Sequence, residues 1–174
     1  MNDKPIKSPT VGVAFLLSQI GAHAANNFEQ RLVAIGLTPQ HAGLLRMLGS
    51  NAGITQQAMA NLFGIFPSRL VALLDELEDK KLLTRRANPK DRRSYHLHLT
   101  SAGRRRTSQI AAITSELEHD LLSALSQAER EELASQLRRI VSQQEITPAV
   151  HPAYRNRDTR QGARTRKTKE INPS

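Results

Sequence analysis

The sequence contains no cysteine and no tryptophan, and aromatic residues make up 3% of its 174 positions. The absence of cysteine excludes disulfides, thiol redox sensing, thiolate catalysis and zinc sites with cysteine ligands. The scarcity of aromatic rings argues against a stacking platform for single-stranded nucleic acid. The sequence also lacks an apolar run long enough to cross a bilayer and the apolar core of a signal peptide. We therefore expect a soluble, cytoplasmic protein with no membrane partner.

Acidic residues are fewer than basic residues in this chain. Lys and Arg total 25 against 16 Asp and Glu, which gives a formal net charge of +9. This balance favours a polyanionic partner, with nucleic acid ahead of an acidic membrane surface. We find no Gly-rich phosphate loop, nucleophile elbow or metalloprotease spacing, so we do not expect an enzyme.

Apolar residues recur at helical spacing along most of the chain and predict six helices. Thr38 with Pro39, Thr55 and Ser126 have the residue types that begin helices. The third and fourth helices are short and flank the turn 63–66, which contains glycine, an arrangement typical of a helix-turn-helix. The predicted helices cover about residues 10–34, 39–48, 56–62, 67–77, 101–125 and 127–141.

Between the fourth and fifth helices the periodicity changes to that of strands. Residues 82–86 predict one strand, and 94–100 alternate strictly and predict a half-buried second one. The segment 88–91, Asn-Pro-Lys-Asp, is a good turn sequence, so the two strands should form a hairpin. We expect His96 and His98 to be exposed residues on one face of this hairpin.

Three sequence stretches, taken in order, resemble the MarR family. They are the helix-strand segment 66–86, the Asp-Arg-Arg sequence at 91–93, and the Leu-Thr-Ser-Ala-Gly sequence at 99–103. The resemblance covers roughly residues 10–145 and is more specific than any one piece. It implies a mostly α fold with a small β-hairpin wing: a winged helix-turn-helix with long N- and C-terminal dimerisation helices. The expected organisation is an arm over 1–9, a MarR-like domain over 10–146 (winged-helix core 38–100, dimerisation helices 10–35 and 101–146) and a tail over 147–174.

Two positions depart from the family pattern. Lys81 stands at the end of the fourth helix, which corresponds to the recognition helix of the family. The family usually has glycine there, and a left-handed cap would cost a residue with a Cβ about 1 kcal/mol. The recognition helix also begins with Phe66 and Pro67, without the usual Ser or Asp cap.

The DNA-contacting residues are expected on the third and fourth helices and the wing. The first turn of a recognition helix faces base edges in the major groove, where Ser68 can donate or accept and Arg69 can bind guanine. At the wing tip, Asp91 should pair with Arg93 and leave Arg92 to enter the minor groove. The alternative is that these charges are simply solvated. The candidate DNA-binding residues are Thr55, Gln56, Pro67, Ser68, Arg69, Arg85, Arg86, Lys90, Asp91, Arg92 and Arg93.

The resemblance also implies a small-molecule pocket between the dimerisation helices and the DNA-binding lobe. The candidate residues for a small aromatic or phenolic effector are His23, Asn27, His41 and His119. We expect no cofactor and no metal site, because the histidines cannot be assembled into a set of three or four ligands.

The sequence thus predicts a sequence-specific regulator of transcription that binds double-stranded DNA. The expected form is a ligand-responsive repressor acting as a homodimer on a pseudo-palindromic operator. The alternatives are a winged-helix module that binds another protein and a metal-responsive regulator.

The C-terminal segment is polar and basic. Residues 149–174 hold seven Lys or Arg against Asp158 and Glu170. A segment with so few apolar residues is expected to be disordered. It could add non-specific phosphate contacts, or it could have no role.

Overall fold

The computed structural model describes residues 11–88 and 91–146, and the described residues form six helices and a two-stranded antiparallel hairpin. The predicted arm and basic tail lie outside these ranges. The elements are α1 (Val13–Val33), α2 (Pro39–Ser50), α3 (Gln56–Phe63), α4 (Pro67–Asp79), β1 (Leu83–Asn88), β2 (Asp91–Leu99), α5 (Ser101–Leu121) and α6 (Gln127–Gln143). The predicted fold class, mostly α with a β-hairpin wing, is confirmed.

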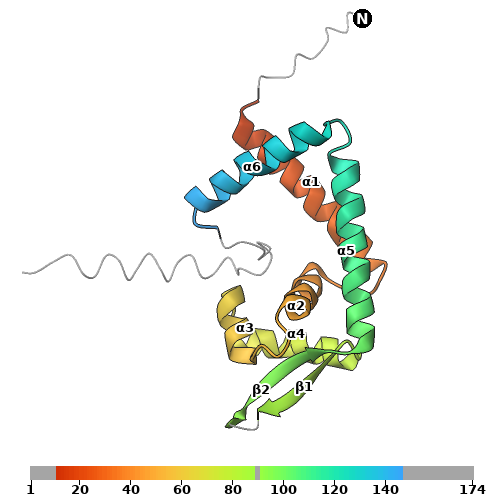
Figure 1. Cartoon of the computed structure of the whole chain (residues 1–174), viewed down its shortest axis with the longest axis vertical. Helices are drawn as coiled ribbons and strands as arrows, with labels where there is room; N and C mark the ends of the chain where they lie inside the picture. Colours follow the sequence, from red (N-terminus) through yellow and green to blue (C-terminus); the bar gives the residue numbers. More distant parts are fainter. Residues whose placement is uncertain (1–10, 89–90, 147–174) are drawn as a thin grey trace, which may run out of the picture.

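The molecule has two ends joined by a long helix (Figure 1). α2, α3, α4 and the hairpin gather at one end, and α1 and α6 lie at the other. α5 runs between the two ends and packs against both α1 and α2. This arrangement separates the helix-turn-helix from the helices that we expect to form a dimer.

Hydroxyl caps set the starts of four helices, and three of these caps were predicted from the sequence. The side-chain oxygens of Thr38, Thr55, Thr100 and Ser126 each accept a hydrogen bond from the backbone N–H three residues later, at 3.0 to 3.4 Å. Each bond satisfies one of the N–H groups that the first turn of a helix leaves unpaired. The helix starts could therefore be placed from residue type.

The end of α5 was predicted wrongly. The helix ends at Leu121, and the chain turns at residues 122–125, where the N–H of Leu125 donates to the carbonyl of Leu122 at 3.0 Å. No glycine or proline marks this turn, and the leucine spacing continues across it. Helical periodicity therefore extended the prediction by a full turn.

α3 and α4 form the helix-turn-helix. Gly64 ends α3 in the left-handed conformation, with φ of 62°, which glycine adopts without steric cost. In the described ranges no single helix is long and apolar enough to cross a membrane. α3 and α4 pass that test as a pair by length and composition, with a bend of 113° between them. A bend of this size is within the usual range for helix-turn-helix motifs.

The core of the described chain lies under the helix-turn-helix and the hairpin. It is dominated by leucine, and helices α2, α3 and α4 supply most of it. The buried apolar residues are Leu32, Leu37, Ala42, Leu44, Leu45, Leu48, Met59, Ala60, Phe63, Leu70, Leu73, Leu74, Leu77, Leu82, Leu83, Leu97 and Ile110. α4 is thus fixed to the core along one side, which leaves its other side for a partner.

The packing around Gly103 explains why the Leu-Thr-Ser-Ala-Gly sequence ends in glycine. A Cβ atom built on Gly103 would lie 1.9 Å from the backbone carbonyl oxygen of Leu82. The hydroxyl of Thr100 also donates to the carbonyl of Lys81 at 2.7 Å. The start of α5 is therefore pressed directly against the chain entering the hairpin, and a side chain at 103 would force them apart.

The hairpin also contacts the segment before α3, which the sequence did not indicate. The N–H of Gly53 donates to the carbonyl of Leu97 at 3.1 Å, and the N–H of Leu97 donates to the carbonyl of Ile54 at 3.0 Å. The segment before α3 thus runs beside β2. The expectation that His96 and His98 are exposed is wrong, because both are half-buried and His96 Nδ1 donates to the Gly53 carbonyl at 2.6 Å.

Candidate nucleic-acid interface

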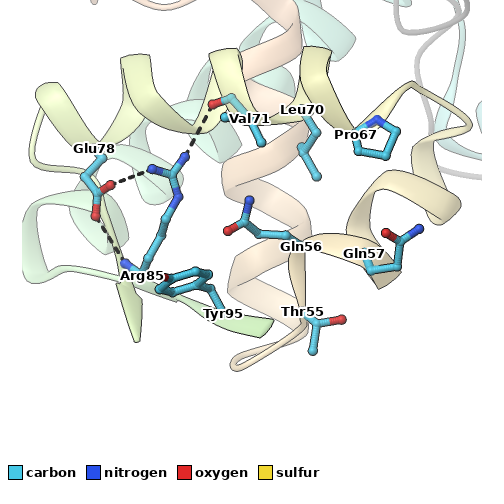
Figure 2. Close-up of a pocket in the computed structure, with 9 residues that line it drawn as sticks. All are labelled: Thr55, Gln56, Gln57, Pro67, Leu70, Val71, Glu78, Arg85 and Tyr95. Carbon is cyan, nitrogen blue, oxygen red and sulfur yellow. Dashed lines mark hydrogen bonds and ion pairs between the residues drawn. The ribbon is translucent and has the colours of Figure 1, made fainter. Parts of the chain in front are cut away.

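A concave surface lies between α3, α4 and the hairpin, and the hollow that it forms has a volume of about 710 Å³. Figure 2 shows side chains of α3 facing those of α4 across it, with Arg85 and Tyr95 at one end and Pro67 and Gln57 at the other. Its lining residues are Thr55, Gln56, Gln57, Pro67, Leu70, Val71, Glu78, Arg85 and Tyr95. The surface therefore joins the two helices of the helix-turn-helix to the wing in one continuous face.

Four predicted DNA-binding residues line this surface: Thr55, Gln56, Pro67 and Arg85. The other lining residues were not predicted from the sequence. Gln57 and Val71 could have been found, because Gln57 follows a predicted residue and Val71 lies one helical turn after Pro67. Tyr95 could not, since its side of the hairpin depends on the packing of the two strands.

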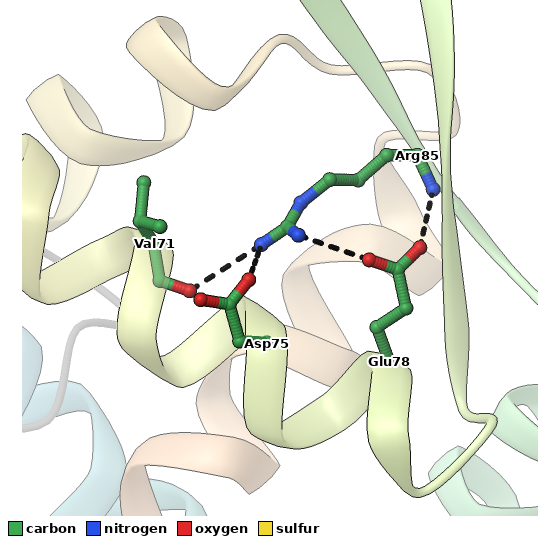
Figure 3. Close-up of polar contacts among 4 residues, drawn as sticks. All are labelled: Val71, Asp75, Glu78 and Arg85. Carbon is green, nitrogen blue, oxygen red and sulfur yellow. Dashed lines mark hydrogen bonds and ion pairs between the residues drawn. The ribbon is translucent and has the colours of Figure 1, made fainter.

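Arg85 is held by the recognition helix (Figure 3). Its guanidinium lies 2.6 Å from an Asp75 oxygen and 2.9 Å from a Glu78 oxygen, and it donates to the carbonyl of Val71 at 3.3 Å. The backbone N–H of Arg85 also donates to Glu78, at 3.2 Å. A planar, forked cation suits several acceptors at once. Its contacts tie β1 to α4, so they set the position of the wing relative to the recognition helix.

Three other predicted contact residues are sequence neighbours of residues that line the concave surface. Ser68 is exposed and Arg69 is half-buried in the first turn of α4, while Arg86 is exposed on β1. Lys90 lies outside the described residues. Asp91, Arg92 and Arg93 belong to β2, and their side chains also lie outside the description, so the roles predicted for them remain predictions.

His41 lies in the core, with 2% of its surface exposed. Its Nδ1 accepts from the N–H of Thr38 at 3.4 Å, and its Nε2 lies 3.0 Å from a carboxylate oxygen of Glu76 on α4. Burial lowers the pKa of His41, and the charge of Lys80 adds to this, while Glu76 opposes it. The neutral imidazole therefore connects the cap of α2 to the recognition helix.

The four predicted effector residues do not gather in one place. His23 and Asn27 are neighbours on α1, with the Asn27 amide nitrogen 2.9 Å from His23 Nε2, whereas His119 is exposed in the last turn of α5. None of them lines the concave surface above or a smaller hollow of about 370 Å³ on α1, which is formed by Asn26, Glu29, Gln30 and Val33. Within the described residues, no three His, Cys, Asp or Glu side chains lie close enough together to hold a metal ion.

Comparison with known proteins identifies the family to which this chain belongs. Residues 35–94 match the model of the MarR family. The chain is 35% identical over 114 residues to a protein of Thauera aromatica named as a transcriptional regulatory protein for the hcr operon, covering 66% of this chain and 69% of that protein. The chain belongs to the MarR family.

Two further similar proteins extend the comparison over most of the chain. The transcriptional repressor Rv2887 of Mycobacterium tuberculosis is 25% identical over 130 residues, covering 75% of this chain and 94% of the repressor. The structure of Staphylococcus aureus MepR in complex with DNA has a TM-score of 0.65 and 26% identity, covering 77% of this chain and 99% of MepR. This chain is a MarR-family transcriptional regulator, and its α3, α4 and hairpin correspond to a winged helix-turn-helix.

One departure from the MarR pattern has a structural effect. Lys81 has a φ of 57°, and the N–H of the following Leu82 donates to the carbonyl of Leu77 at 2.9 Å. A residue with a Cβ thus occupies the left-handed cap that glycine occupies at low cost. The expectation drawn from the sequence is confirmed.

Proposed function

We propose that this regulator is a sequence-specific repressor that binds double-stranded DNA as a homodimer, with α4 in the major groove and the hairpin as a wing. The observation that carries the proposal is the continuous face formed by α3, the first turns of α4 and the hairpin. The similarity to MepR, whose structure was solved with DNA, supports this use of the face. In this arrangement the exposed Ser68 and the half-buried Arg69 lie where a recognition helix contacts base edges.

Exposed apolar residues on α1 support the homodimer. Five large apolar residues near its start are 39% to 72% exposed: Val13, Phe15, Leu16, Leu17 and Ile20. α6 lies at the same end of the molecule and has no fully buried residue in the described chain. Of the five apolar residues, Val13, Leu16, Leu17 and Ile20 share one side of α1 by their helical spacing. An exposed apolar face of this kind is typical of a protein interface, and a second copy related by two-fold symmetry would cover it.

A small-molecule effector remains part of the proposal at His23 and Asn27. Both lie on α1 at the end of the molecule assigned to the dimer, where an aromatic ligand could alter the spacing of two DNA-binding lobes. His41 is not retained as an effector ligand, because it is buried and connects α2 to α4. Metal control is not proposed, because the described residues supply no cluster of ligands.

The test uses a duplex that the wild-type protein enriches from a random-sequence pool. Binding to this duplex is measured in competition with unrelated DNA, and we expect a preference of about a thousandfold or more. Arg69→Ala should cost about 1 to 3 kcal/mol on the enriched duplex and less on random DNA. Arg105→Ala is the matched control, because Arg105 is exposed on α5, outside the concave surface. A protein that prefers no sequence would contradict the proposal and favour a protein-interaction module.

A further inference from the structure

The recognition helix begins with an exposed aromatic residue. Phe66 is the N-cap of α4, and 65% of its surface is exposed. At α2, α3, α5 and α6 the same position holds Thr or Ser, whose hydroxyl accepts from the first turn. Phe66 makes no such bond in the described structure. The chain thus gives up a stabilising cap at α4, and the phenyl group that replaces it is not buried in exchange.

The surface next to Phe66 is apolar and contains amides. Pro67 and Val71 follow on one face of α4, and both line the concave surface. Val71 is 40% exposed, and Gln56 faces it from α3, whereas Gln57 lies beside Pro67. The one cation among the lining residues, Arg85, has its charge balanced by Asp75 and Glu78. This part of the interface is therefore suited to base edges more than to phosphates.

The chemistry of the phenyl group limits what it can bind on DNA. A phenyl ring cannot donate a hydrogen bond to a phosphate or to a purine edge. In the major groove the apolar group available to it is the 5-methyl group of thymine, which apolar side chains are known to contact. The start of a recognition helix is also the segment that reaches base edges.

A protein partner is a weaker explanation for this exposure. The exposed apolar residues assigned to the dimer lie on α1, at the opposite end of the molecule from α4 (Figure 1). Phe66 directly precedes Pro67, which lines the face that the proposed function assigns to DNA.

We propose that Phe66 is a specificity-determining residue that contacts the 5-methyl group of a thymine in the major groove of each half-site. This inference rests on the proposed function. The chain thereby prefers thymine at that position through an apolar contact, while Gln56 on α3 can bind the edge of an adenine.

The experiment removes methyl groups from the DNA one at a time. A duplex enriched from a random pool by the wild-type protein is prepared with each thymine replaced in turn by deoxyuridine, which lacks the methyl group. Affinity for each duplex is measured for wild type, Phe66→Ser, Phe66→Leu and Leu62→Ser. Phe66→Ser supplies a hydroxyl cap and should remain folded. Leu62→Ser is the control, because Leu62 is exposed by 39% but lies at the end of α3.

We expect one thymine per half-site at which methyl removal weakens wild-type binding about fourfold, the effect of losing one buried methyl group. Phe66→Ser should be insensitive at that position, Phe66→Leu should keep part of the effect, and Leu62→Ser should behave as wild type. Equal losses in wild type and Phe66→Ser, or no sensitive thymine in wild type, would overturn the inference.

Thermal unfolding provides the second readout. Phe66→Ser should melt at or above the wild-type temperature, and a melting temperature several degrees lower would instead assign Phe66 a packing role and overturn the inference. Failure of the proposed function has a different signature, because the wild type would then enrich no sequence from the pool.

Discussion

The backbone conformation of single residues affects the stability of this regulator. Lys81 adopts a left-handed conformation that costs a residue with a Cβ about 1 to 2 kcal/mol. Lys80, its neighbour, has a φ of −73°, which any residue adopts. The two lysines share a charge and a place at the end of α4 but differ in strain.

Lys81→Gly should therefore raise the free energy of unfolding by about 0.5 to 1 kcal/mol, since the relief of strain exceeds the entropy that glycine adds to the unfolded chain. Lys80→Gly, the matched control, should lower it by a similar amount. Urea unfolding at equal protein concentrations measures both. A loss of stability in both variants would show that Lys81 makes side-chain contacts worth more than the strain.

His41 makes stability depend on pH. Its pKa is lowered in the folded protein, mainly by burial, so between that pKa and the unfolded value of 6.5 the unfolded chain binds more protons. The free energy of unfolding should fall as pH drops below 6.5, by at most about 1.4 kcal/mol per pH unit.

His41→Gln keeps a polar residue at the third position of α2 and cannot titrate. Its unfolding free energy should change less between pH 7 and pH 5.5 than that of wild type, measured by urea unfolding at each pH. Parallel pH profiles for the two proteins would rule out His41 as the source of the dependence. The His41–Glu76 pair itself could not be foreseen, because it joins helices whose relative rotation is set by core packing.

At the scale of elements, the sequence predicted well wherever a local rule decides the outcome. Thr38, Thr55 and Ser126 begin their helices because a hydroxyl cap satisfies N–H groups within the same segment. Contacts between elements were not predictable in this way. Arg85 was expected to contact DNA, and its guanidinium instead contacts two carboxylates that lie 10 and 7 residues before it on another element.

Arg85→Lys tests the role of this contact. Lysine keeps the charge but cannot bridge Val71, Asp75 and Glu78 with a planar fork, so the wing should be positioned less firmly relative to α4. We expect weaker DNA binding with an unchanged dependence of affinity on salt, because the number of cations is the same.

Arg86→Lys is the control, since Arg86 is the exposed neighbour on the same strand. Fluorescence anisotropy over a salt titration measures both variants. If Arg85 instead contacted a phosphate as a point charge, Arg85→Lys would bind as tightly as wild type.

At the scale of the whole molecule, the proposed DNA-binding face lies at one end and the proposed dimer face at the other. Leu16 and Ile20 are 42% and 50% exposed, and they lie one helical turn apart on α1. Burying such a face in a dimer stabilises it by about 25 cal/mol for each Å² of apolar surface removed from water.

Ile20→Glu should place a charge in this interface and shift the protein to a monomer that binds DNA more weakly. Gln19→Glu adds the same charge on the same helix at an exposed polar position and should remain dimeric. Light scattering after size exclusion gives the mass of each. A wild-type protein that is already monomeric at micromolar concentration would contradict the assignment of α1.

The measurement that tests the central claim most directly is a footprint on the duplex enriched by the wild-type protein. Two symmetric α4 helices should protect two major-groove segments with related sequences, one helical turn apart, or about 10 base pairs from centre to centre. Protection of both segments should be lost together in Ile20→Glu. A single protected segment, or protection of the backbone without any preferred sequence, would contradict a dimeric repressor that reads DNA through α4.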